Sequence, residues 1–423
     1  MKNWLLKTIL LMLLFSLWTQ HAFSQRRLLE YSNEVPSIDY AQPTNDSVTR
    51  LFDAINRGEI NINYEGERGY LDALLEVLSI SPTSQVLIFS KTALKGRLVS
   101  PMTPRAIYFN DDLYISFIPG TPALEIASMD PLLGPVFYEI PLEPEEGINL
   151  RRHTSRCLNC HVQNYLADGA VPVMLYKSAL VNESGEIFIN GLAQRHTNTT
   201  TVLAERWGGW YVTGLHGEQQ HRGNLNFVTS PNVESLDLSG NGNLTSLEGL
   251  FATDPYITPY SDIVALLVMQ HQVDVQNEIS RVNYQVSSII SREGEISNEL
   301  LAEKIEPLLR ALFMSDEAPL TNSVSGVSGF TDFFQTIGPK DSEGRSLRDF
   351  DLQSRIFRYP LSFQIYSEAF NALPEEAFLY LRQRITSILN GLDQSSDFAH
   401  ISESERKSIF EIIEETKPDF LIR

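Results

Sequence analysis

The segment SDIVALLVMQHQVDVQNEISRVNYQVSSIISREG, residues 261–294, is where the apolar pattern of this chain changes from that of strands to that of a helix. Its inward-facing positions recur at steps of three and four residues, close to the helical period of about 3.6. These positions are Val264, Leu267, His271, Val275, Ile279, Val282, Val286 and Ile289. We expect one long helix, with Ser261 as its N-cap and Gly294 as its C-terminal stop.

Upstream of this helix, the chain is rich in short apolar runs of the strand type. Val, Ile, Tyr and Phe dominate the runs, and Pro, Gly and Asp separate them, which is the pattern of strands and turns. The runs begin at Gln85, Arg105, Leu113, Ala123 and Pro135, and two further strand candidates begin at Glu186 and Gly209. Helices are expected before them, at residues 47–57 and in YLDALLEVL, residues 70–78.

Downstream of the long helix, the pattern stays helical. Pro374 can start one helix and Gly391 can end it, while Ser402 and Glu405 have the spacing of a capping box. We therefore predict an α+β fold, in which a β-rich N-terminal half packs against a helical C-terminal half. The expected organisation is a leader at 1–24, a β-rich region at 25–255 and a helical region at 256–423 that folds together with it.

The first 24 residues have the pattern of a secretory signal peptide. Lys2 and Lys7 precede an apolar run from Ile9 to Trp18, and small residues near Ser24 suit cleavage. No later segment approaches the roughly 18 to 20 apolar residues that a membrane-spanning helix needs. We expect a periplasmic or secreted protein with no membrane span after the leader is removed.

The charge of the chain is strongly negative. Its formal net charge is −20, and loss of a leader with two lysines and no acidic residue would leave −22. Such a charge repels nucleic acid and anionic membranes and favours basic partners. We therefore expect no nucleic-acid partner, and a redox partner protein of basic character.

Two cysteines, Cys157 and Cys160, are the only ones in the chain, and His161 follows directly in the sequence CLNCH. This spacing is the attachment signature of c-type haem. One helical turn places both thiols on one side, where each forms a thioether with a porphyrin vinyl group, and the histidine then reaches the iron. The motif predicts one covalent haem c, with Cys157 and Cys160 as attachment sites and His161 as axial ligand.

Three other interpretations of CLNCH stay open. A disulfide would close a loop of only four residues and would stabilise the chain little. A thioredoxin-type dithiol expects a βαβ setting, which the flanking sequence does not show clearly. A zinc site would need a fourth ligand besides these three.

Six blocks of the sequence resemble a poorly characterised family of secreted bacterial proteins described as cytochrome c-domain proteins. The blocks are SPMTPRAIYFNDDLYISFIPG (100–120), DPLLGPVFY (130–138), CLNCH (157–161), ERWGGWYVTGLHG (205–217), SDIVALLVMQHQ (261–272) and GRSLRDFDLQSRIFRYP (344–360). The resemblance spans most of the chain from about residue 80 onward. It implies a haem and an export route rather than a reaction, and it supports the roles of Cys157, Cys160 and His161.

The second axial position decides how such a haem is used, because two strong ligands favour electron transfer and an open position permits oxygen or peroxide chemistry. The helical periodicity makes His271 the first candidate for a sixth ligand. His216 and His221, in the Gly-rich segment TGLHGEQQHRG, are less favoured, and His196 in the polar QRHTNTTT is weaker still.

The block ERWGGWYVTG holds the only two tryptophans that remain after the leader, Trp207 and Trp210. They and Arg206 are candidates for haem contact, although a core aromatic cluster is the favoured interpretation of the tryptophans. The favoured hypothesis is an exported monohaem electron-transfer protein. The alternatives are a haem enzyme with an open distal site, of peroxidase or oxidase type, and a haemless periplasmic redox or binding protein.

Overall fold

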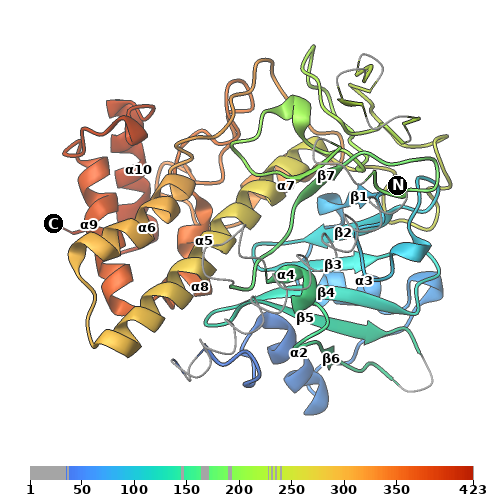
Figure 1. Ribbon diagram of the computed structural model, residues 1–423, viewed down its shortest axis with the longest axis horizontal. Coiled ribbons are helices and arrows are strands. Elements are labelled where there is room, and N and C mark those ends of the chain that lie inside the picture. The colour runs from blue at the N-terminus through green and yellow to red at the C-terminus, as the bar shows by residue number, and fades with distance from the viewer. Residues whose placement is uncertain are drawn as a thin grey trace, which may run out of the picture.

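Six antiparallel strands, arranged in sequence order, form the main sheet (Figure 1). They are β1 (Val86–Ile88), β2 (Arg105–Phe109), β3 (Leu113–Phe117), β4 (Ala123–Asp130), β5 (Gly134–Pro141) and β6 (Arg151–Arg152). The computed structural model describes residues 35, 38–143, 147–162, 171–188, 193–226, 228–229, 232–233, 236–238 and 241–422, so the predicted leader lies outside the described residues. The five strand-like runs predicted from Gln85 to Pro135 are the strands β1 to β5.

A two-stranded ribbon of β7 (Lys177–Ala179) and β8 (Gln194–His196) lies apart from this sheet. The run from Glu186 extends beyond the described residues, and its described part forms only a bridge between Val181 and Ile187. The prediction of a strand from Gly209 is wrong. This glycine has φ of 81° and packs so closely on Ser90 that a Cβ atom would come within 2.6 Å, so the chain turns here.

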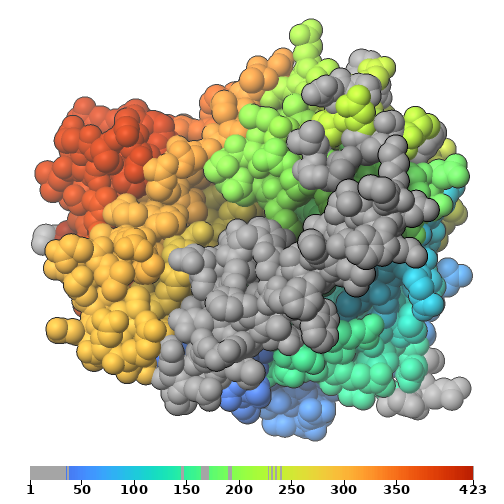
Figure 2. All heavy atoms as spheres, in the orientation of Figure 1, coloured from blue at the N-terminus to red at the C-terminus, as the bar shows by residue number. Residues whose placement is uncertain are grey.

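Most of the helices follow the sheet in the sequence, and loops connect them. They are α2 (Ser47–Asn56), α3 (Leu71–Val77), α4 (Leu158–His161), α5 (Ile263–Glu293), α6 (Asn298–Leu312), α7 (Phe330–Thr336), α8 (Glu368–Asn371), α9 (Glu375–Leu389) and α10 (Glu403–Thr416). The fold is therefore α+β, as predicted. In the space-filling view, α9 and α10 form one end of the molecule (Figure 2).

The long helix α5 runs between the sheet and the C-terminal helices (Figure 1). Asp262, rather than the predicted Ser261, is its N-cap, and its carboxylate accepts the N–H groups of Val264 and Ala265. Ser261 instead joins two other segments, since its hydroxyl donates to the Tyr211 carbonyl and accepts the Leu87 N–H. Gly294 ends the helix in the left-handed conformation, as expected.

Asp262 also binds a second segment. Its other carboxylate oxygen accepts the N–H groups of Val327 at 2.7 Å and Ser328 at 2.9 Å, and its side chain is fully buried. A carboxylate offers about four acceptor positions, whereas a serine hydroxyl offers two. This capacity explains why the aspartate, and not Ser261, begins α5.

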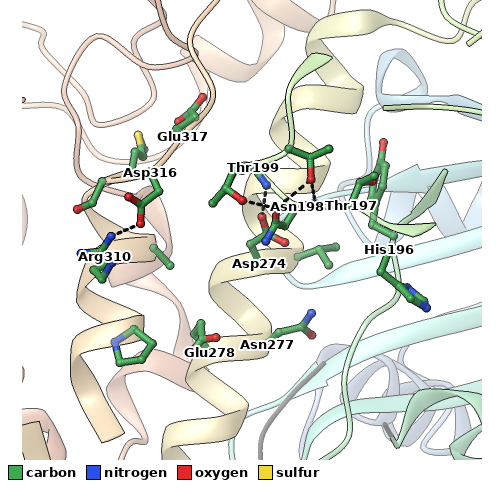
Figure 3. A pocket seen from close by; sticks show the side chains of 18 of the residues that line it. His196, Thr197, Asn198, Thr199, Asp274, Asn277, Glu278, Arg310, Asp316 and Glu317 are labelled. Carbon is green, nitrogen blue, oxygen red and sulfur yellow. Dashed lines mark hydrogen bonds and ion pairs between the residues drawn. The ribbon is translucent and has the colours of Figure 1, made fainter. Parts of the chain in front are cut away.

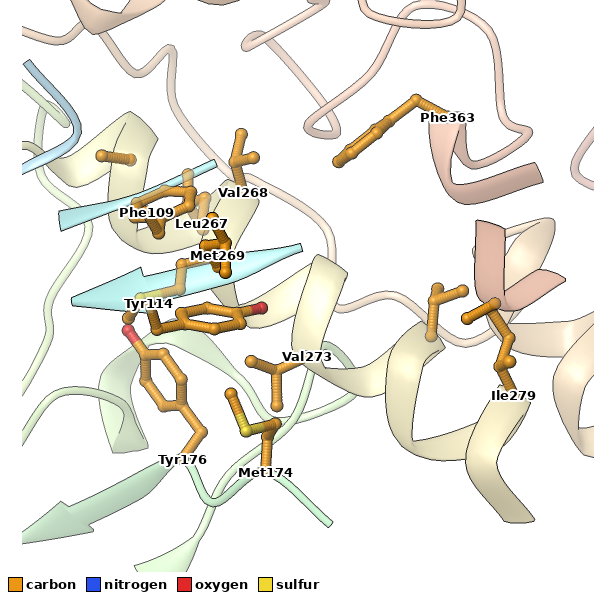
Figure 4. Close-up of a cluster of buried hydrophobic side chains, with 14 of the residues drawn as sticks. Phe109, Tyr114, Met174, Tyr176, Leu267, Val268, Met269, Val273, Ile279 and Phe363 are labelled. Carbon is orange, nitrogen blue, oxygen red and sulfur yellow. The ribbon is translucent and has the colours of Figure 1, made fainter. Parts of the chain in front are cut away.

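The contact between α5 and the sheet is both apolar and polar. Figure 4 shows Phe109 and Tyr114 of the sheet beside Leu267 and Met269 of α5. The Tyr114 hydroxyl donates to the Gln276 amide oxygen at 2.7 Å, so buried polar groups are satisfied within the interface. One continuous hydrophobic core includes residues of the sheet and of the helices.

The C-terminal helix signals agree with the sequence. Pro374 stands directly before α9, and Gly391 follows its last turn with φ of 70°. Ser402 and Glu405 form the predicted capping box of α10. Within the described residues, no helix has the length and apolar character needed to cross a membrane.

The variant Asp262→Ala tests the buried cap of α5. It leaves four backbone N–H groups without their acceptor; loss of an N-cap alone costs about 0.5–2 kcal/mol, and each unsatisfied buried donor adds about 1–3 kcal/mol. We expect the free energy of unfolding, from urea titration, to fall by at least about 3 kcal/mol. Ser402→Ala, at the exposed cap of α10, is the control and should cost about 1 kcal/mol. Equal losses in the two variants would contradict this account.

Candidate cofactor site

The CLNCH motif forms the short helix α4, with Cys157 at its N-cap. Leu158 is buried and anchors the turn in the core, whereas Cys157 is half-buried and Cys160 is exposed. Both cysteines are free thiols. One turn of helix thus presents two thiols and an imidazole at the edge of the core.

His161 is held by two contacts with Val173. Its Nδ1 lies 2.8 Å from the Val173 carbonyl oxygen, and the Val173 N–H donates to the His161 carbonyl at 2.8 Å. A carbonyl only accepts, so Nδ1 carries the proton and Nε2 keeps its lone pair. The ring also packs on Phe137 of β5, with centroids 4.3 Å apart. Burial lowers the pKa of His161 to about 4, so the imidazole is neutral, which is the form that binds metals.

Cys157, Cys160 and His161 line a cavity of about 510 Å³. Its floor is one face of the sheet, where Ile107, Ser116, Glu125 and Glu139 stand in register across β2 to β5. Met269 and Val273 of α5, together with residues of β7 and β8, form other walls. The motif therefore faces a chamber built by the sheet, the ribbon and the long helix.

The Cys157 thiol is poorly suited to thiolate chemistry. Burial, with the nearby charge of Glu125, raises its pKa to about 11. Redox-active cysteines instead have a lowered pKa, because the thiolate is the nucleophile. A helix of four residues offers little dipole to counter this effect.

Four cationic side chains that were not singled out from the sequence line the cavity: Lys91, Lys95, Arg105 and Lys177. Lys91 and Lys95 pair with Glu186 and Glu139. Burial lowers the pKa of Arg105, which lines the cavity beside Ile107, and no carboxylate of the described residues lies within ion-pair distance of it. Lys177 of β7 also lines the cavity, and burial lowers its pKa too. The alternation of RAIYF would have placed Arg105 on the face of Ile107.

His271, the first candidate for a sixth ligand, does not line this cavity. Its Nε2 lies 2.8 Å from the Ser362 hydroxyl, and its ring packs on Phe357 with centroids 5.2 Å apart. Met269 and Val273 of the same helix do line the cavity. Residues two apart on a helix differ in direction by about 200°, so His271 faces the segment of Phe357 and Ser362 instead.

His216 and His221 form a separate buried pair, with ring centroids 4.8 Å apart. The Trp207 indole packs on His221 at 5.5 Å. Burial lowers the pKa of both histidines, to about 3 for His221. The structure brings these two together, but neither lines the cavity of His161.

Of the three residues that were candidates for haem contact, one lines the cavity and two lie outside it. Trp210 lines the cavity, where it stacks on Tyr176 with centroids 4.7 Å apart and donates to the Lys177 carbonyl. Trp207 is fully buried outside it. Arg206 also lies outside, because its guanidinium donates to the carbonyls of Thr201 and Thr199, each at 2.6 Å, in the core.

Two histidines that the sequence did not favour do line the cavity, His153 and His196. His153 follows β6 and lies 3.8 Å from the Glu139 carboxylate. His196 ends β8 and pairs with Lys177 across the ribbon. Its pKa is lowered to about 4 by burial, by Lys177 and by His161, so its imidazole is also neutral.

A second cavity, of about 830 Å³, adjoins the first (Figure 3). The loop of residues 197–202, the polar side of α5 and the end of α6 line it. Met174, Tyr176, His196 and Val273 line both cavities. These four residues form a wall, which we call the shared wall.

Asp274 lies in the second cavity and accepts the Thr199 N–H at 2.6 Å. Burial raises its pKa from 3.8 to about 7, although Thr199 and Arg206 oppose the shift. The Glu317 carboxyl lies in the same cavity, and burial raises its pKa to about 7 as well. Near neutral pH, these carboxyl groups are partly protonated.

The variant Asp274→Asn tests this burial. The raised folded pKa means that the unfolded chain releases the proton first, so Asp274 costs stability progressively as pH rises from about 4 to about 7. We expect the asparagine variant to gain stability relative to the wild type at pH 8, and little or nothing at pH 4. Thermal unfolding at both pH values measures the difference. Equal effects at the two pH values would show that folding does not raise the pKa of Asp274.

Comparisons with protein-family models, with curated proteins and with solved structures find no match to this chain. The resemblance to cytochrome c-domain proteins therefore stays a prediction. The function of the chain is argued from the cavity at CLNCH itself.

Proposed function

We propose that this chain is an exported c-type haem protein that transfers electrons. Cys157 and Cys160 attach one haem covalently, and His161 is its axial ligand. The contact between His161 Nδ1 and the Val173 carbonyl, 2.8 Å, carries this proposal. Metal-binding histidines hold their second nitrogen in this way, which fixes the tautomer and directs Nε2 at the metal.

The cavity fits the cofactor in size and chemistry. Its 510 Å³ lie within the range of about 300–1,000 Å³ that is typical of ligand pockets. Ile107, Phe137 and Trp210 supply apolar and aromatic wall. Arg105 and Lys177 supply positive charge for the two carboxylates of haem. The bound haem supplies one-electron chemistry, and the chain attaches it, orients the imidazole and shields one face.

The haemless dithiol alternative is less well supported. A thioredoxin-type cysteine needs a lowered pKa, and that of Cys157 is raised to about 11. Thioether formation, by contrast, needs a thiol beside the vinyl group and no resting thiolate. The half-buried Cys157 and the exposed Cys160 border the cavity that the haem would enter.

The leader at 1–24 and the charge of the chain support the rest of the proposal. Haem c is attached after export, so the leader predicts a periplasmic or secreted protein. The net charge of −20 favours a basic redox partner protein and opposes binding of nucleic acid.

A haem enzyme of peroxidase or oxidase type is the second candidate. One observation favours it: the 830 Å³ cavity adjoins the proposed haem cavity and could admit a substrate. A resting iron in the high-spin state, with peroxide-dependent turnover, would favour the enzyme over the electron carrier.

Covalent attachment is tested by expression in a host with a c-type cytochrome maturation system. We expect the purified chain to gain the mass of one haem, and the denatured protein to give a pyridine haemochrome spectrum of the thioether type. Cys157→Ser with Cys160→Ser should retain no haem after denaturation, because the chain has no other cysteine.

The two single variants are matched controls, since each leaves one thiol for attachment. They should give less covalent haem than the wild type, with the vinyl-type spectral shift expected of a single thioether. A wild-type chain that is exported and folded without covalent haem would overturn the proposal.

A further inference from the structure

Histidines are few enough in this chain to be compared one by one. Seven of the eight follow the predicted leader, and all seven are described. His216, His221, His271 and His400 lie outside the 510 Å³ cavity, whereas His153, His161 and His196 line it. A second imidazole ligand for a haem on His161 must therefore be His153 or His196.

His153 is attached to the same wall as His161. Its N–H donates to the Phe137 carbonyl at 2.9 Å, and the Phe137 ring packs on His161. A haem plate has two faces, and a second ligand must approach from the face opposite the first. The backbone of His153 is thus attached to β5, the strand whose Phe137 packs on His161, and its imidazole lies beside Glu139.

His196 comes from a separate element. The pairing of Lys177 with His196 in the β7–β8 ribbon fixes its backbone. Figure 3 shows its ring directed away from Asp274 and Thr199 of the second cavity. His196 and His161 line the same cavity from two different elements, the β7–β8 ribbon and α4. These features place the His196 imidazole in the cavity on an element other than α4.

The two methionines of the cavity wall, Met174 and Met269, lie in an apolar environment. Met174 and Met269 belong to the hydrophobic core, and Figure 4 shows Met174 beside Val273. Methionine commonly fills gaps in such cores. Their burial is explained by packing, although a thioether can also bind haem iron.

We propose that His196 is the second axial ligand of the haem iron, so that His161 and His196 hold the iron between two imidazoles. This inference rests on the proposed haem attachment. Two strong ligands favour electron transfer over oxygen or peroxide chemistry. Ligation by His196 therefore favours electron transfer over an enzyme of peroxidase or oxidase type.

Because His196 belongs to the shared wall, loss of its side chain has a second expected effect. The residue lines both cavities, so loss of its imidazole opens the iron toward the 830 Å³ cavity. A small external ligand then finds a free coordination position and room to reach it. In the wild type, the same ligand must first displace His196.

The experiment uses the full-length protein with haem attached. Ferric wild type should show a low-spin absorption and electron paramagnetic resonance spectrum, and His196→Ala should show a high-spin one. Added imidazole should restore the low-spin spectrum of the variant, with an apparent affinity at least about tenfold higher than for the wild type, because no internal ligand has to be displaced. The matched controls His153→Ala and His271→Ala should stay low-spin.

Each other outcome overturns the inference. A high-spin wild type, or a low-spin His196→Ala, removes His196 as a ligand. Conversion to high spin by Met174→Leu or Met269→Leu instead assigns a thioether. If His196→Ala does not fold, the electron paramagnetic resonance spectrum of the ferric wild type still distinguishes ligation by two imidazoles from ligation by one imidazole and one thioether. Haem content after denaturation is measured throughout, because absent haem contradicts the proposed function, whereas full haem content with the wrong spin state contradicts only His196.

Discussion

The carboxylate of Asp262 is the constraint on which the arrangement of the molecule depends. It is fully buried and accepts two N–H groups at the start of α5 and two from Val327 and Ser328. These bonds fix where the helix begins, and a fixed start sets the direction of every later side chain, because each residue adds about 100°. The rotation that turns Met269 and Val273 toward the cavity is the same rotation that turns His271 toward Ser362.

The cavity combines elements that are far apart in the sequence. The sheet supplies a floor, α4 supplies two thiols and an imidazole, and the β7–β8 ribbon supplies Lys177 and His196. The double contact between His161 and Val173 joins α4 to the segment that leads into the ribbon. His161 and the ribbon wall are therefore positioned by one local connection, which would favour a constant geometry at the proposed iron.

Local patterns were enough to predict β1 to β5 and the helices α2, α3, α5, α9 and α10, but they also predicted a strand at Gly209 that does not form, and they did not predict the composition of the site. Strands β2 to β5 and helix α5 carry their own periodicity, and CLNCH carries its own spacing. The periodicity also placed His271 inward, correctly, since only 1% of it is exposed. However, α5 is buried on nearly all sides, so an inward position does not say which neighbour it meets. His196 ends a three-residue strand in a polar segment, and only its pairing with Lys177, a tertiary contact, turns it to the cavity.

The exposure of the motif explains why covalent attachment suits this site. Helix α4 has four residues, and Leu158 alone among them is buried, so the motif contributes little apolar contact to hold a cofactor. The face of the sheet that forms the floor of the cavity is partly polar, because it carries Ser116, Glu125 and Glu139. A haem held only by packing would bury part of its apolar surface against these groups, at a cost in desolvation. In the proposed haem protein, two thioether bonds would remove the dependence on that contact, and the wall residues would need only to orient the ring and supply the iron ligands.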